Sequence, residues 1–273
     1  MIIAYHEGGL WASSADTIVK TMASPLKGIL RRIVERSGYT LMNLKVLRDP
    51  QRQKPITRED FFNLYFSKAD PRTFFFVQVG ANDGKTNDPI YPYVTRYGLS
   101  GIAIEPQADV YEMLTRTYGS FRGVRCVHAA IGAVTGRMPF YTVKPGFKTE
   151  KNFARVTGIA SFDEAVFRKT LKNKLPPGAE ADAYIQRTLI DVLSFEDLAR
   201  TYAVTSIDML QLDCEGYDYE ILKTFDFGRF SPSLINLESM HFSQDVRLAC
   251  ERLLAEQGYR TFRTANDICA YRV

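Results

Sequence analysis

The sequence predicts an α/β fold of the Rossmann-like type, with a seven-stranded, mostly parallel sheet flanked by helices. From Thr73 onward, short apolar runs alternate with stretches of helical periodicity, which is typical of parallel strands joined by helices. The chain has 273 residues, 45% of them hydrophobic, which is enough for one α/β domain with a small appendage. Two glycines, Gly80 and Gly84, bracket the loop after the first of these strands, where open α/β sheets form a ligand crevice.

The strands of this sheet are expected wherever a short apolar run is bounded by turn-forming residues. Seven runs meet this description, and the spacing between them leaves room for connecting helices. They are Phe74–Val79, Gly101–Glu105, Val124–Ala130, Ile207–Asp213, Leu234–Glu238, Tyr259–Arg263 and Ile268–Arg272.

An insertion interrupts the alternation of strands and helices. Two runs, Met138–Val143 and Arg187–Val192, are expected to pair as a hairpin. Residues 144–186 lie between them and are rich in glycine, proline and basic residues, with some helix expected around Phe162–Leu171. Connections of this length usually have a function.

The N-terminal residues differ in character from the rest. Residues 1–70 are expected to form a basic helical extension, followed by a catalytic domain at 71–273. One amphipathic helix is predicted from Ser24–Pro25 to Gly38, and a shorter one begins at Phe61–Phe62. Residues 20–58 contain ten Lys or Arg and two acids. This segment is either a solvated helix face or a contact for a membrane surface or a lipid-linked substrate.

Composition narrows the class of protein. The four cysteines have neither the spacing of a zinc site nor that of a disulfide framework. No apolar stretch has the length of a membrane span, and the first residues lack the pattern of a secretory signal. A cytoplasmic protein is expected, and the sequence does not indicate its oligomeric state.

The segment Val77-Gln78-Val79-Gly80-Ala81-Asn82-Asp83-Gly84 is the first candidate site. Alone it could be only a tight turn, but Glu105 ends the next strand, where an acid can accept hydrogen bonds from ribose hydroxyls. The loop lacks the G-x-G-x-x-G spacing that suits a dinucleotide pyrophosphate, so a nucleoside cofactor without that group is favoured. The expected cofactor-binding residues here are Gln78, Gly80, Asn82, Asp83, Gly84, Glu105 and Pro106.

A second candidate site follows the strand Ile207–Asp213. If this strand is central, Asp213 and Glu215 lie at the same sheet edge as the glycine loop. Acids in this position can instead cap the following helix, because the helix dipole favours negative charge in the first turn. Asp213 closes the strand itself and is predicted to be functional, in both cofactor binding and catalysis.

The third candidate site is Leu237-Glu238-Ser239-Met240-His241. A histidine near neutral pKa can accept the proton that an alcohol loses when it is alkylated, so His241 is the preferred base and Glu238 a catalytic neighbour. His6 and His128 are more simply explained as ordinary hydrogen-bonding residues. Carboxylates with one imidazole could also hold Mg²⁺, but the spacing does not require a metal.

These segments resemble the FkbM methyltransferases. The resemblance covers about Phe74 to His241 and rests on five motifs: Val79–Gly84, Ile104–Pro106, Leu212–Tyr217, Gly158–Phe162 and Asn236–Ser239. Cys214 departs from the small or β-branched residue of many relatives.

The resemblance implies a class I methyltransferase fold, S-adenosylmethionine (SAM) as methyl donor, and O-methylation of a sugar, glycan or natural-product hydroxyl. It also implies that the glycine loop lines the cofactor site, that Glu105 holds the ribose, and that Asp213 faces the methionine part or the acceptor.

Two alternatives stay open. A nucleic-acid methyltransferase could use the basic segment to bind phosphates, but amino-directed enzymes have a Pro-Pro-aromatic motif where this chain has Asp213-Cys214-Glu215-Gly216. Acids there would also repel phosphates, so nucleic acid is not the expected partner. A module that binds SAM or NAD without catalysis, or a short-chain dehydrogenase, is the other alternative.

Overall fold

The computed structural model describes residues 2–6, 9–12, 40–43, 57–148, 156 and 159–272. The chain divides into two compact units, Met1–Ala69 and Asp70–Val273, which are treated separately below.

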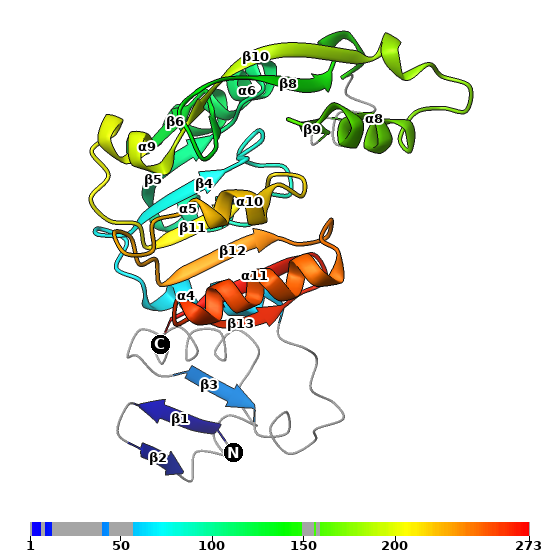
Figure 1. The fold of residues 1–273 in the computed structure, drawn as a ribbon. Coiled ribbons are helices and arrows are strands. Elements are labelled where there is room, and N and C mark those ends of the chain that lie inside the picture. Colours follow the sequence, from blue (N-terminus) through cyan, green and yellow to red (C-terminus); the bar gives the residue numbers. More distant parts are fainter. Residues whose placement is uncertain are drawn as a thin grey trace, which may run out of the picture. The chain divides into compact units, whose positions relative to one another are not determined.

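The N-terminal unit has a small antiparallel sheet that the sequence did not predict. Strand β1 (Ile2–His6) lies between β2 (Gly9–Ala12) and β3 (Thr40–Asn43) (Figure 1). Helix α4 (Arg58–Lys68) confirms the helix expected at Phe61–Phe62, and it begins earlier because Thr57 and Asp60 form a reciprocal capping box. The predicted helix up to Gly38 lies outside the described residues, as does most of the basic segment 20–58.

The main sheet of the second unit contains all seven predicted strands. Their order is β13-β14-β12-β11-β4-β5-β6, with β14 antiparallel to both of its neighbours and the other strands parallel to one another. The predicted Rossmann-like class is confirmed by this order. The bounds are β4 Phe75–Val79, β5 Ser100–Ile104, β6 Val124–Val127, β11 Met209–Leu212, β12 Leu234–Glu238, β13 Arg260–Arg263 and β14 Asp267–Tyr271.

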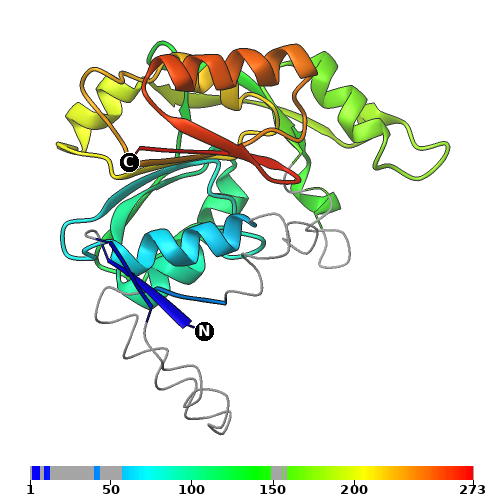
Figure 2. The ribbon, with the colours of Figure 1, turned by 90° about the horizontal axis from the view of Figure 1, so that it is seen from below.

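Helices cover both faces of this sheet. Helices α5 (Tyr91–Tyr97) and α6 (Ala108–Tyr118) follow β4 and β5, while α9 (Phe195–Thr201), α10 (Asp218–Lys223) and α11 (Gln244–Glu256) pack with the inner strands in one large apolar core. Figure 2 shows α11 and α6 on opposite faces. The inner strands are buried along nearly their whole length, as expected for a sheet covered on both sides.

A second, four-stranded sheet has the order β7-β10-β8-β9. The predicted hairpin is confirmed as β8 (Gly136–Val143) paired with β10 (Ile185–Leu193). The predicted strand Val124–Ala130 is too long, because β6 ends at Val127 and Ala130–Ile131 forms β7, which pairs with β10 instead.

The insertion between β8 and β10 has its own small core. It contains η2 (Pro145–Phe147), β9 (Ala160–Ser161), α8 (Glu164–Lys172) and η3 (Ala181–Ala183), so the helix predicted around Phe162–Leu171 is confirmed. Buried residues of α8 pack against Val143 of β8. Figure 1 shows α8 on the side toward which β12 points. None of the helices in the described ranges is long and apolar enough to cross a bilayer.

Candidate functional site

The glycine loop after β4 has a backbone that only glycine fits at its first position. Gly80 has φ +76°, and a Cβ atom there would lie 1.9 Å from the carbonyl oxygen of Asp213. Gly84, at φ +70°, lies against α6, where a Cβ would come within 2.6 Å of Leu114. The loop therefore contacts the end of β11 at one glycine and helix α6 at the other.

The two polar residues of the loop have different roles. Asn82 also has positive φ, at 50°, and its side chain accepts a hydrogen bond from Asp83 N at 2.8 Å. The Asp83 carboxylate accepts from the N–H groups of Lys85 and Thr86 and from the Thr86 hydroxyl. It therefore holds the shape of the loop, whereas the sequence analysis assigned it to the cofactor.

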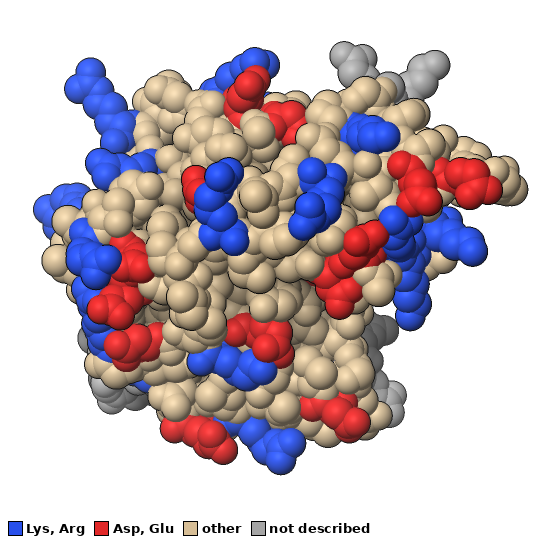
Figure 3. Space-filling view, turned by 45° about the horizontal axis from the view of Figure 1, so that its top comes forward, with Lys and Arg blue, Asp and Glu red and all other residues tan. Residues whose placement is uncertain are grey.

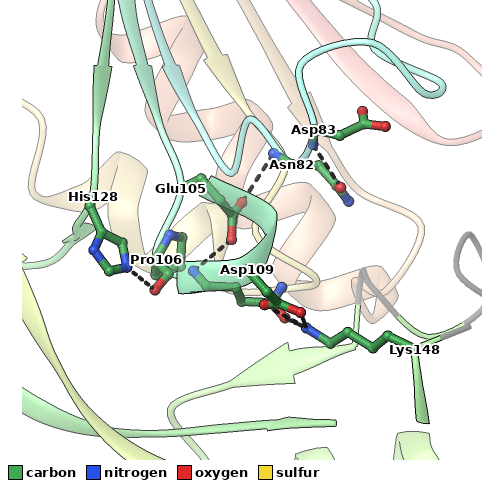
Figure 4. Close-up of polar contacts among 8 residues, drawn as sticks. Asn82, Asp83, Glu105, Pro106, Asp109, His128 and Lys148 are labelled. Atoms are coloured by element: carbon green, nitrogen blue, oxygen red, sulfur yellow. Dashed lines mark hydrogen bonds and ion pairs between the residues drawn. The ribbon is translucent and has the colours of Figure 1, made fainter. Parts of the chain in front are cut away.

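Glu105 joins this loop to the next strand. Its side chain is buried, and its two oxygens accept from Asn82 N at 3.0 Å and Gln107 N at 2.8 Å (Figure 4). Burial raises the pKa of the Glu105 carboxyl group to about 7, although both hydrogen bonds oppose the rise. Each carboxylate oxygen has a second lone pair, so hydroxyl groups of a ligand could still donate to it.

Gln78 and Pro106, both predicted to bind the cofactor, also contact other parts of the protein. Gln78 is buried within the sheet, and its amide donates to Asp88 at 2.8 Å. Asp88 accepts from the first N–H groups of α5. Gln78 thus supports the loop region from inside the sheet. The carbonyl oxygen of Pro106 lies 3.1 Å from His128 Nε2.

A lysine that the sequence analysis missed completes this corner. Lys148, from the insertion, donates to the Gln107 side-chain oxygen at 2.7 Å and pairs with Asp109 at 3.1 Å (Figure 4). Its side chain is only 3% exposed. No local pattern could have indicated this contact, because Lys148 is about forty residues from its partners.

The second and third predicted sites meet at the ends of β11 and β12. His241 Nε2 lies 3.4 Å from Glu215 Oε2 and 4.0 Å from Glu238 Oε2. The other expected member, Asp213, is exposed at the end of β11. Ligand atoms of Glu215, Glu238 and His241 all lie within 4.8 Å of one another, which a cation site would also require.

Burial and neighbouring charges shift the pKa values within this group, which we call the acid–histidine cluster (Asp213, Glu215, Glu238 and His241). Asp213 opens onto solvent, but the protein around it removes part of its hydration, and this and the charge of Glu238 raise its pKa well above the usual value. Burial and the charge of Glu215 raise the pKa of Glu238 to about 7. The hydrogen bond that His241 donates to the Glu215 carboxylate raises the pKa of His241. The cluster can therefore hold and release protons near neutral pH.

Asp218, the first residue of α10, holds the loop that leads from β11 into this helix. Asp218 is fully buried and accepts from Cys214 N and Gly216 N, both at 3.2 Å. Burial and Glu238 raise the pKa of Asp218 to about 7. Glu215 itself has φ 51°, which turns the chain back toward His241. Helix α10 has no side-chain cap hydrogen bond, so capping does not explain Asp213 and Glu215.

The insertion contributes an aromatic wall beside this cluster. The rings of Phe162 and Tyr217 have centroids 5.8 Å apart, and Phe140 of β8 lies 5.0 Å beyond Phe162. Tyr217 is 42% exposed and follows Glu215 in the same loop. Lys174 of the insertion is close enough to lower the pKa of Glu238.

Comparison with known proteins gives the family to which this chain belongs. Residues 78–261, about two thirds of the chain, match the family model described as the methyltransferase FkbM domain. The chain belongs to the FkbM methyltransferase family. The resemblance noted in the sequence is thereby confirmed. No curated protein matches the chain.

Three solved structures illustrate the likeness of this FkbM-family chain to other methyltransferases. The methyltransferase FkbM from Methylobacillus flagellatus KT has 14% identity and a TM-score of 0.48, with 79% of this chain and 48% of that one covered. This chain thus spans about half of the length of that protein.

The other two are more distant. Precorrin-6y C5,15-methyltransferase from Geobacter metallireducens GS-15 has 12% identity and a TM-score of 0.37 over 82% of this chain and 94% of that one. Aeropyrum pernix fibrillarin, solved with bound S-adenosyl-L-methionine, has 11% identity and a TM-score of 0.33 over 73% and 66%. The assignment rests on the family match and the strand order, not on these scores.

Proposed function

We propose that this protein is a SAM-dependent O-methyltransferase that acts on a hydroxyl group of a sugar, a glycan or a natural product. The observation that supports this most is the arrangement along one sheet edge. A glycine loop bonded to Glu105 ends β4, and the acid–histidine cluster lies at the ends of β11 and β12, with Gly80 packed against Asp213.

The cofactor would lie along the glycine loop. Gly80 and Gly84 let the loop pack closely against the end of β11 and against α6, and Glu105 can accept hydrogen bonds from two ribose hydroxyls. SAM carries a sulfonium and an ammonium group. The acidic surroundings of Asp213 would attract both positive charges.

Methyl transfer from a sulfonium is an in-line displacement: the acceptor oxygen attacks the methyl carbon while the carbon–sulfur bond breaks. The protein chiefly has to align the three atoms. His241 would take the proton that the hydroxyl group loses, and Glu215, 3.4 Å away, would stabilise the imidazolium that forms. Asp213 is the second candidate for this base.

The lining of the cluster favours a neutral, hydroxyl-rich acceptor. Carboxylates accept hydrogen bonds from hydroxyl groups, and exposed aromatic rings such as Tyr217 stack on the apolar face of a sugar or a polyketide. The acids would repel a phosphate backbone, which argues against nucleic acid. Figure 3 shows Lys and Arg interspersed with Asp and Glu on the visible face, without a continuous basic patch among the described residues.

Two further expectations belong to this proposal. His241 serves as the proton acceptor in this proposal, so no step is assigned to a divalent cation. The basic residues 20–58 could bring the enzyme to a membrane surface or a lipid-linked acceptor, and the enzyme is expected to be cytoplasmic.

The test has a binding part and a turnover part. Calorimetry should show that the protein binds SAM and not NAD. Release of S-adenosylhomocysteine is then measured against neutral sugars, nucleotide-sugars and natural-product alcohols, with RNA and DNA as competing classes. His241→Ala and Asp213→Asn should bind SAM yet lose turnover. Full turnover in both variants, or methylation of nucleic acid alone, would refute the proposal.

A further inference from the structure

The side chain of Lys148 is buried, although burial of a charged group costs free energy of hydration. Its side chain is 3% exposed, whereas its partner Asp109 is 37% exposed. An ammonium group that leaves water loses several kcal/mol of hydration, about as much as a single ion pair returns. Lysines are consequently almost never buried without a specific partner. The position of this side chain therefore needs an explanation beyond stability.

Its contacts form a continuous chain to the glycine loop. Lys148 donates to the Gln107 side chain at 2.7 Å, Gln107 N donates to Glu105 at 2.8 Å, and Asn82 N donates to the other Glu105 oxygen at 3.0 Å (Figure 4). Three segments that are distant in the sequence meet here: the insertion, the turn between β5 and α6, and the loop after β4.

We propose that Lys148 is a positioning residue of the cofactor site, which holds the turn of Gln107 and Asp109 and keeps the Glu105 carboxylate available to the ribose. The inference rests on the proposed function, because it takes Glu105 as a ribose ligand. Lys148 itself need not touch the cofactor.

The charges around Glu105 explain why a cation is needed. Glu105 faces Asp109 from α6, the Cys214 thiol from the loop after β11, and Lys148 from the insertion. Burial and Asp109 raise the pKa of Glu105, whereas Lys148 and two backbone N–H groups lower it, with a result of about 7. Without Lys148, only the two backbone N–H groups would oppose burial and the charge of Asp109. Glu105 would then take up a proton at a higher pH and accept fewer hydrogen bonds.

The experiment measures the titration of Glu105 directly, by the ¹³C shift of its carboxyl carbon in the unliganded protein, with Glu105→Gln to assign the signal. Lys148→Met should raise the titration midpoint by about one pH unit. Lys148→Gln, which keeps a donor for Gln107 and guards against misfolding, should raise it too. Lys148→Arg, which keeps the positive charge, should leave the midpoint at the wild-type value. Lys144→Met is the matched control, because Lys144 is exposed and its ammonium group donates to Ala183 O within the insertion.

SAM affinity is then measured by calorimetry at pH 7 and pH 9. Lys148→Met should weaken binding at least threefold at pH 7 and much less at pH 9, where Glu105 is charged in every variant. An unmoved midpoint, or an equal loss at both pH values, would overturn the inference. If the midpoint moves while the wild-type protein fails to bind SAM, the link to Glu105 stands and the proposed cofactor is wrong.

Discussion

Replacing Gly80 by alanine tests the junction between the glycine loop and the end of β11. An alanine at φ +76° carries a backbone strain of about 1–2 kcal/mol. Its Cβ would also lie 1.9 Å from Asp213 O, so one of the two strand ends must move by more than 1 Å. Overpacking of this kind costs roughly 1–3 kcal/mol. The total expected loss in the free energy of unfolding is about 2–5 kcal/mol.

Gly98 provides a matched control for this substitution. It ends α5 at φ +67°, and no atom lies within 4 Å of the position that a Cβ would take, so Gly98→Ala carries the backbone strain alone. By thermal unfolding we expect Tm to fall by about 2–6 °C in Gly98→Ala and about 5–15 °C in Gly80→Ala. Only Gly80→Ala should also lose SAM binding in calorimetry. Equal Tm values and intact binding in both variants would show that this close approach does not matter.

Three further outcomes are expected for the acid–histidine cluster and its aromatic wall. Turnover should fall as the pH drops through the raised pKa of His241. In Glu215→Gln this acid limb of the pH profile should move to lower pH, because the anion that stabilises the imidazolium is gone. If the limb stays in place, His241 is not the group that accepts the proton. Phe162→Ala should raise KM for the acceptor about five- to tenfold and leave SAM affinity unchanged. Val166→Ala, at an exposed position of the same insertion, should change neither value. Equal effects of the two variants would show that the aromatic wall does not bind the acceptor. Dialysis against EDTA should leave turnover intact, and activity that returned only with Mg²⁺ would show that the cluster binds a metal.

The main sheet was predictable because its signals are local. Each strand is a short buried run, and the loop glycines and the terminal acids mark where the strands end. The end of β6 was mispredicted for a non-local reason. Ala130 continues the apolar run, but its partner is Val192 of β10, far along the chain, and that pairing draws it into the second sheet. The strands at residues 2–12 and 40–43 were missed because they lie outside the alternation of apolar runs and helical stretches that marked the main sheet.

The candidate site was predicted in outline but not in its details. The pairing of the glycine loop with Glu105 and the meeting of Glu215 with His241 followed from parallel strands ending at one edge. Sequence patterns cannot distinguish an acid that faces a ligand from one that holds its own loop. The oxygens of Asp83 accept from neighbouring N–H groups, and its role in cofactor binding stays a prediction.

The antiparallel strand β14 has a consequence for the order of folding. Within the main sheet, β13 pairs only with β14, and β14 in turn separates it from β12. During synthesis β13 leaves the ribosome first, yet it has no place in the sheet until β14 follows. The edge of β12 stays open over the same interval, next to Glu238 at its end. Assembly of the candidate site is therefore expected to be a late event, completed by the strand made after all of its sheet neighbours.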